Sequence, residues 1–202
     1  MEYANDNLAS SGCTGLACVL LLSLPLLAWG CGSDDETSLR HYGDEITVAA
    51  GALEVSVEDH YAAMHNATGI EEMHDLEAHH SQEALSFMGS MLDADYSLQT
   101  CGRHMRISMH APLLAELDGP RQAMHASMNA MEAEVEHHAD AIWDLQDVGA
   151  VADEEDRHHT AMLDLLDQFS VHSDDMLAAM DSMEREGVSM MCSMDTHMHH
   201  SW

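Results

Sequence analysis

The stretch VADEEDRHHTAMLDLLDQFSVHSDDMLAAMDSM, residues 151–183, decides the fold that this sequence predicts. One set of its residues recurs at alternating steps of four and three, the spacing that puts side chains on a single stripe of a helix. The stripe consists of Val151, Glu155, His158, Met162, Leu165, Phe169, His172, Met176, Ala179 and Met183. We therefore expect a long helix whose buried face includes glutamate and histidine.

Three other segments show the same stepping. Residues 120–148 carry Met124, Met128, Met131, Val135, His138, Ile142 and Leu145. Residues 70–93 carry Met73, Glu77, His80, Ala84, Phe87 and Met91, and residues 46–67 carry Leu53, Val57, His60, Met64 and Ala67. Such stripes are buried only if they face one another.

Glycine and proline divide these segments into two pairs. Gly69 and Gly149 break each pair, and the stretch 93–120 separates the pairs. We expect helices at 46–67, 70–93, 120–148 and 151–187. Short loops within each pair imply antiparallel neighbours, so the predicted fold is an all-α, up-down-up-down four-helix bundle with a longer second hairpin.

The two predicted hairpins resemble each other in sequence. Residues 57–80 match residues 135–158 at a shift of 78 positions, which aligns His60 with His138, Glu77 with Glu155, and His80 with His158. HSQEALSFMGSM at 80–91 also matches HSDDMLAAMDSM at 172–183. The sequence therefore predicts a duplicated hairpin.

Composition limits the possible partners. The 202 residues include 37 Asp and Glu against six Lys and Arg, all six of them arginine, and the net charge is −31. Such a surface repels nucleic acid, so we expect cationic partners. No nucleophile motif, phosphate-binding loop or nucleotide fingerprint is present, which favours a binding protein and leaves an enzymatic role open.

The N-terminus predicts export. Residues 16–30, LACVLLLSLPLLAWG, are apolar and uncharged, as in a secretory signal, and Cys31 follows. LLAWGC resembles the lipobox of bacterial lipoproteins, which implies a lipid on Cys31; a plain cleaved signal and a single anchor helix are the alternatives. Each places the domain at the cell envelope, on the periplasmic or outer surface. We expect a signal at 1–31, a flexible tether at 32–44, the bundle at 45–189 and a tail at 190–202.

Two cysteines lie beyond the signal. Cys101 and Cys192 fall at nearly matching places in the two hairpins, past helices expected to end at the same end of the bundle. In an oxidising compartment they are disulfide candidates. The alternative is a pair of free thiols or soft metal ligands.

Six polar residues share one level of the predicted core. Burying such groups without partners costs free energy, and lysine is absent, so protonated histidines or a metal must compensate the glutamates. Imidazole and carboxylate suit a transition metal such as copper, zinc or iron. The alternative is partly solvated histidines at a bundle end. The candidate ligands are His60, Glu77, His80, His138, Glu155 and His158.

EAHH from Glu77 and EDRH from Glu155 are two Glu-x-x-His pairs. In this the sequence resembles the ferritin-like dimetal-carboxylate bundles. The resemblance implies two further carboxylate ligands, here Glu58 and Glu136, and a possible dimetal oxidase activity.

The tail MMCSMDTHMHHSW, residues 190–202, suggests a second metal site. Interleaved thioether and imidazole groups bind copper, zinc or nickel; a tail without a role is the alternative. Its candidate ligands are Met194, His197, Met198, His199 and His200. The sequence thus favours metal buffering or sensing at the cell envelope, with a dimetal oxidase and a structural lipoprotein with pH-responsive histidines as alternatives.

Overall fold

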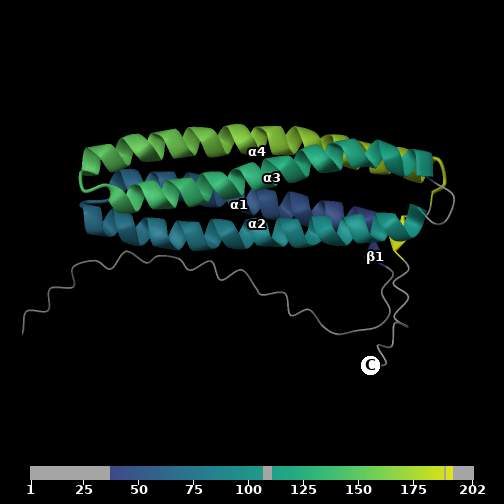
Figure 1. The fold of residues 1–202 in the computed structure, drawn as a ribbon, viewed down its shortest axis with the longest axis horizontal. Coiled ribbons are helices and arrows are strands. Elements are labelled where there is room, and N and C mark those ends of the chain that lie inside the picture. The colour runs from purple at the N-terminus through teal and green to yellow at the C-terminus, as the bar shows by residue number, and fades with distance from the viewer. Residues whose placement is uncertain (1–36, 107–110, 189, 193–202) are drawn as a thin grey trace, which may run out of the picture. The chain divides into compact units, whose positions relative to one another are not determined.

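A computed structural model describes residues 37–106, 111–188 and 190–192. Its helices are α1 (Leu39–Asn66), α2 (Ile70–Arg106), α3 (Ala111–Asp144) and α4 (Val148–Arg185), and two short strands, β1 (Thr37–Ser38) and β2 (Met191–Cys192), flank them (Figure 1). The predicted all-α four-helix bundle is confirmed. The second hairpin is the longer one, with helices of 34 and 38 residues against 28 and 37 in the first.

Each helix packs against two others. α1 contacts α2 and α4, and α3 also contacts α2 and α4, so the four helices form a square in chain order. Three-residue connections at 67–69 and 145–147 close the two hairpins at one end of the bundle (Figure 1). The four predicted stripes, here also called seams, therefore meet along a common axis.

The expected break over 93–120 is wrong. α2 continues to Arg106 and α3 already begins at Ala111, so Pro120 lies inside a helix. Gly and Pro in this stretch predicted a loop, but a proline removes only one backbone hydrogen bond, and a helix survives when its apolar face is buried. Leu98 and Leu117, 1% and 4% exposed, supply that burial.

Two other boundaries also differ from the prediction. α1 begins at Leu39, because the Ser38 side chain caps it by accepting a hydrogen bond from the His41 amide at 3.2 Å. Residues 39–44, expected in the tether, are therefore helical. α4 begins at Val148 after the cap Asp147, where α3 was expected to continue to 148.

The buried seam shifts by one residue midway along α2 and α4. Met88 and Leu166 are buried where Phe87 and Leu165 were predicted. Farther along α4, Ser173 and Met180 replace the predicted His172 and Ala179 in the core. In both helices two steps of four follow one another at this point, so the alternation of fours and threes changes phase, and Met91 and Met183 are buried as predicted.

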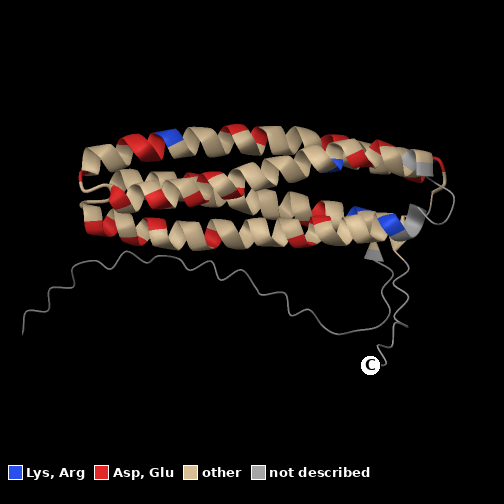
Figure 2. Cartoon of the chain, in the orientation of Figure 1, with Lys and Arg blue, Asp and Glu red and all other residues tan. Residues whose placement is uncertain are grey.

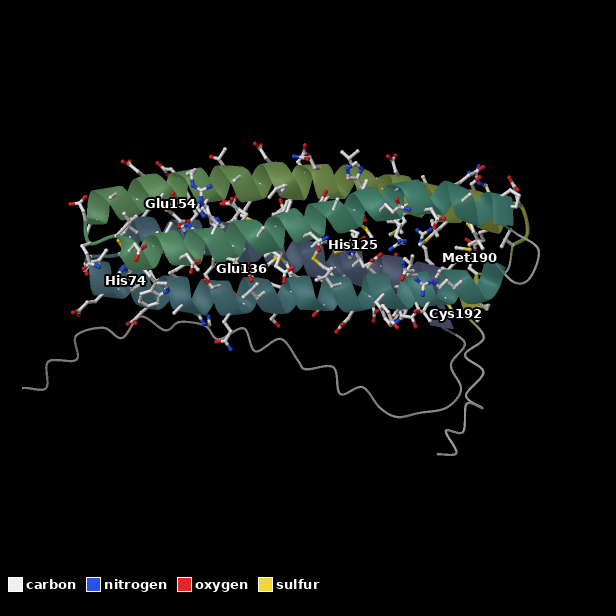
Figure 3. All side chains as sticks on the ribbon, in the orientation of Figure 1. His74, His125, Glu136, Glu154, Met190 and Cys192 are labelled. Atoms are coloured by element: carbon white, nitrogen blue, oxygen red, sulfur yellow. A yellow bond between two sulfur atoms is a disulfide. The ribbon has the colours of Figure 1, made fainter. Side chains whose placement is uncertain are left out.

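The end of the bundle away from the hairpin turns is closed by its flanking segments. β1 pairs antiparallel with β2, and the Leu39 amide donates to the Met190 carbonyl at 2.9 Å. Cys101 and Cys192 form a disulfide. Figure 3 shows Met190 and Cys192 at this end and His74 near the other.

Acidic side chains are spread along all four helices, and arginines are few (Figure 2). Among the described residues, no helix is long and apolar enough to cross a membrane. The predicted signal with Cys31, and the tail ligands from Met194 to His200, lie outside the described residues.

Candidate metal centre

Four of the predicted ligands meet in the core near the hairpin turns, one from each helix. They are His60, Glu77, His138 and Glu155, and one ligand atom from each lies within 4.8 Å of the others. All four are buried, with exposed fractions between 0% and 6%. A set of His and Glu side chains in this arrangement could hold a metal ion.

Nitrogen and oxygen atoms alternate around the centre of this group. His60 Nε2 lies 3.2 Å from Glu77 Oε2 and 3.2 Å from Glu155 Oε2. His138 Nε2 lies 3.1 Å and 3.2 Å from the same two oxygens. Ligands about 2.0–2.1 Å from a tetrahedral zinc ion stand roughly 3.3 Å apart, and the four nitrogen–oxygen separations are close to this value.

By distance these four contacts are ion pairs, but none of them has the geometry of a hydrogen bond. None of the four has a hydrogen-bond partner of acceptable geometry, although all are shielded from solvent. Buried polar atoms in proteins are nearly always hydrogen-bonded, and each exception requires an explanation. A metal ion at the common centre would satisfy all four.

His80 and His158 lie directly beside the four-residue group. The His80 ring stacks on His60 at a centroid distance of 4.0 Å, and the His158 ring stacks on His138 at 3.9 Å. Both nitrogens of His80 and Nε2 of His158 are buried without a partner. The two predicted residues outside the group therefore add three further unpaired donor atoms to this level of the core.

A second set of charged residues surrounds the α3–α4 side of the site. Glu154 Oε1 lies 3.4 Å from Nδ1 of His138, and Glu134 Oε1 lies 3.1 Å from Nδ1 of His158. Arg157 binds both carboxylates, at 3.0 Å from Glu134 and 2.6 Å from Glu154. Sequence reasoning missed these two glutamates; each precedes a seam histidine of its own helix by four residues, which was the available signal.

Without a metal, the group neutralises itself. Burial opposes charge on His60 and His138, but the adjacent carboxylates outweigh it, raising the pKa of His138 to about 9 and that of His60 above its usual value. Burial likewise disfavours ionised Glu77 and Glu155, but the histidines hold the pKa of both carboxyls well below the usual range. Two imidazolium and two carboxylate groups thus balance.

The stacked histidines behave in the opposite way. Burial and the nearby charge of His60 lower the pKa of His80 to about 3. Burial and the charge of His138 lower the pKa of His158 to about 4. Both rings are therefore neutral at physiological pH, the form in which imidazole ligates a metal.

Apolar layers enclose the site along the bundle axis. Met64, Met73, Ile142 and Val151, one from each helix, form a separate buried cluster. The main core, which includes Val57, lies on the other side. In each helix the site residues and these apolar neighbours belong to the same buried stripe of heptad positions.

The carboxylates implied by the ferritin-like resemblance do not join the site. The Glu58 side chain is 54% exposed and pairs with His159 at 3.4 Å, and Glu136 is exposed. Residues two positions apart on a helix point in different directions, so burying His60 and His138 turns both glutamates outward. The donors from α1 and α3 are histidines.

The comparisons add no family to this geometry: no protein-family model, curated protein or solved structure matches the chain.

Proposed function

We propose that this protein is an exported, lipid-anchored helical bundle that binds a transition metal ion and serves metal buffering, sensing or homeostasis at the cell envelope. One observation carries the metal proposal. Four buried donor atoms from four helices converge at 3.1–3.2 Å without hydrogen bonds between them. A merely structural ion-pair cluster would instead orient its N–H groups toward its carboxylates.

The donor set favours a divalent ion. Glu77 and Glu155 supply two negative charges, which a divalent cation balances in a buried site, whereas a monovalent ion would leave an uncompensated charge. Imidazole and carboxylate suit zinc, iron or divalent copper, and the group has no sulfur ligand that would select monovalent copper. Binding displaces the protons of His60 and His138, because only neutral imidazole ligates.

The test is zinc binding by the full chain made without a purification tag. We expect stoichiometric zinc in the protein, and the same amount after the tail change His197→Ser, His199→Ser and His200→Ser. His138→Ala should lose the zinc, and the matched control His137→Ala, an exposed neighbour, should retain it. Zinc that disappears with the tail histidines, or none at all, contradicts a core site.

The disulfide supports the proposed export. Disulfides persist in oxidising compartments and are rare in the cytosol, and Cys101–Cys192 joins residues 91 positions apart. Mass analysis of the protein from membranes should find lipid on Cys31, and Cys31→Ser should release the protein from them. An unmodified N-terminus after cleavage supports the plain signal, and an uncleaved chain supports the anchor helix.

A dimetal oxidase of the ferritin-like kind is the second candidate. The three unpaired nitrogens of His80 and His158 favour it, because they could ligate a second ion beside the first. Reduced iron with oxygen should then be oxidised catalytically, and Glu77→Gln or Glu155→Gln should abolish turnover. If no oxidation occurs and no metal binds, the remaining interpretation is a structural lipoprotein whose buried histidines respond to pH.

A further inference from the structure

The two halves of the site have matching ligands but different surroundings. His60 and His80 come from the α1–α2 hairpin, and His138 and His158 come from the α3–α4 hairpin at positions 78 residues later. Both pairs stack in nearly parallel planes, at 6° and 10°. The inner layer therefore follows the sequence repeat closely.

The layer outside the ligands breaks this correspondence. In the α3–α4 half, Glu134 and Glu154 face the Nδ1 atoms of the two histidines, and Arg157 holds both carboxylates in place. Glu134 and Glu154, here called the outer carboxylates, have side chains only 15% and 17% exposed. They are close enough to the core to fix the orientation of each ring.

Among the residues that the structure describes, the α1–α2 half has no equivalent. The residues 78 positions before the outer carboxylates and their arginine are Ser56, Leu76 and His79. Ser56 donates to Glu83 at 2.8 Å and not to an imidazole. Within the described part of the chain, His80 has no hydrogen bond at either ring nitrogen.

We propose that the outer carboxylates are positioning residues that preorganise His138 and His158 to hold the metal ion. His60 and His80 then form the half of the site that releases the ion first during exchange. The inference rests on the proposed metal-binding function and adds the order in which the ligands bind the metal ion. A carboxylate that accepts from Nδ1–H fixes the tautomer with the Nε2 lone pair free. Nε2 of His138 lies beside the Glu77 and Glu155 oxygens, and Nε2 of His158 is buried without a hydrogen-bond partner.

This arrangement has a kinetic consequence. An incoming ion meets two imidazoles whose rings are already oriented, so once it displaces the proton of His138 it binds them without a conformational cost. His80 must first be oriented, because no hydrogen bond fixes either of its ring nitrogens. The ion therefore binds first to, and leaves last from, the α3–α4 half.

The test compares zinc affinity and dissociation rate in the full chain, using competition with a chromogenic chelator. Glu154→Ala and Glu134→Ala should weaken zinc binding roughly 10- to 100-fold, the usual effect of removing such a partner. Glu136→Ala on the exposed face of α3, and Glu83→Ala in the other half, are matched controls that should bind as the wild type does. Equal affinity in all four variants overturns the inference.

Two further measurements keep the outcome independent of folding. Imidazole nitrogen resonances of the zinc-loaded wild type should show Nδ1–H on His138 and His158, and the opposite tautomer there overturns the inference without any variant. Glu154→Gln, which keeps an acceptor oxygen, should lose less affinity than Glu154→Ala. If the wild type itself binds no zinc, the proposed function fails as well, whereas binding that is indifferent to Glu134 and Glu154 removes only this inference.

Discussion

Among the described residues, buried carboxylates lie in two places of the bundle, and their surroundings differ. Asp95 on α2, 3% exposed, accepts from Arg121 at 3.1 Å with both oxygens and from His125 at 3.0 Å. Glu77 and Glu155 have histidine nitrogens just as near, at 3.1–3.2 Å, but no hydrogen bond joins them to these atoms. Distance alone therefore does not separate a structural cluster from a ligand site.

What separates the two places is where the donor hydrogens can point. Around Asp95, one acceptor group receives bonds from two side chains, and the buried charge is fully paired. At Glu77 and Glu155, two imidazoles each face two carboxylate oxygens, and no orientation of one N–H serves both well. The hydrogen bonds of the first place are complete as it stands, whereas the second is balanced in charge but leaves these atoms without hydrogen bonds that a central ion could replace.

Glu155→Gln should have the largest effect, because it removes a ligand and a buried charge together. Metal binding should be lost, and the free energy of unfolding of the metal-free protein should fall by about 3–5 kcal/mol, since the Nε2 atoms of His60 and His138 then share the single carboxylate of Glu77. Calorimetric titration with zinc and urea unfolding measure the two losses. Glu136→Gln on the exposed surface is the control, and zinc binding that survives Glu155→Gln would refute the ligand assignment.

Asp95→Asn should have a smaller effect and act on stability alone. The amide still accepts one hydrogen bond, but Arg121, with a side chain 12% exposed, loses its counter-charge. We expect the free energy of unfolding to fall by about 1–3 kcal/mol, the cost of leaving a buried polar group poorly paired. Zinc affinity should not change. A large loss of zinc affinity would show that the two polar places are coupled.

Replacing all four candidate ligands by apolar residues should raise the stability of the metal-free protein instead of lowering it. With His60, Glu77, His138 and Glu155 all changed to Leu, the metal-free protein should gain about 1–2 kcal/mol in the free energy of unfolding, as when buried ion groups are replaced by packed hydrophobic residues. Urea unfolding in the presence of a chelator measures this gain. A loss of stability would mean that the ion-pair cluster itself, rather than metal binding, explains these residues.

Sequence periodicity predicted the bundle and the position of the site along the bundle axis, because both depend on the spacing of residues within single helices. His60 and His138, or Glu77 and Glu155, share a seam with their apolar neighbours, and antiparallel hairpins bring such seams together. The expected loop over 93–120 was wrong because Gly102 and Pro120 are local signals that tertiary burial overrides.

The outer layer could not be predicted in the same way. Glu134 contacts His158 on the neighbouring helix, and Glu154 contacts His138, so each contact depends on how α3 and α4 are rotated against each other. A one-residue shift of the seam, as occurs between Phe87 and Met88, is enough to change such a pairing. Sequence spacing fixes the stripe of a helix, but the cross-helix partner requires the packed structure.

The smallest expected effect that distinguishes the candidate metal centre from the Asp95 cluster is the pH dependence of stability. In the unfolded chain, His80 and His158 become protonated as the pH falls below about 6.5. In the folded protein their pKa values are about 3 and 4, so protons bind preferentially to the unfolded chain between these limits. The metal-free protein should therefore lose stability on acidification. His138, with a raised pKa of about 9, stabilises fully below about 6.5 and loses that contribution as the pH rises through 9.

Metal-free stability should therefore peak near neutral or slightly acidic pH, and zinc should abolish the alkaline decline because the ion has already displaced the proton of His138. Urea unfolding from pH 4 to 10, in high salt to screen the net charge of −31, measures both limbs. His158→Gln should flatten the acid limb, and His125→Gln beside Asp95 should leave both limbs in place. Stability that rises from neutral pH to pH 9 in the metal-free protein would contradict charged histidines between Glu77 and Glu155.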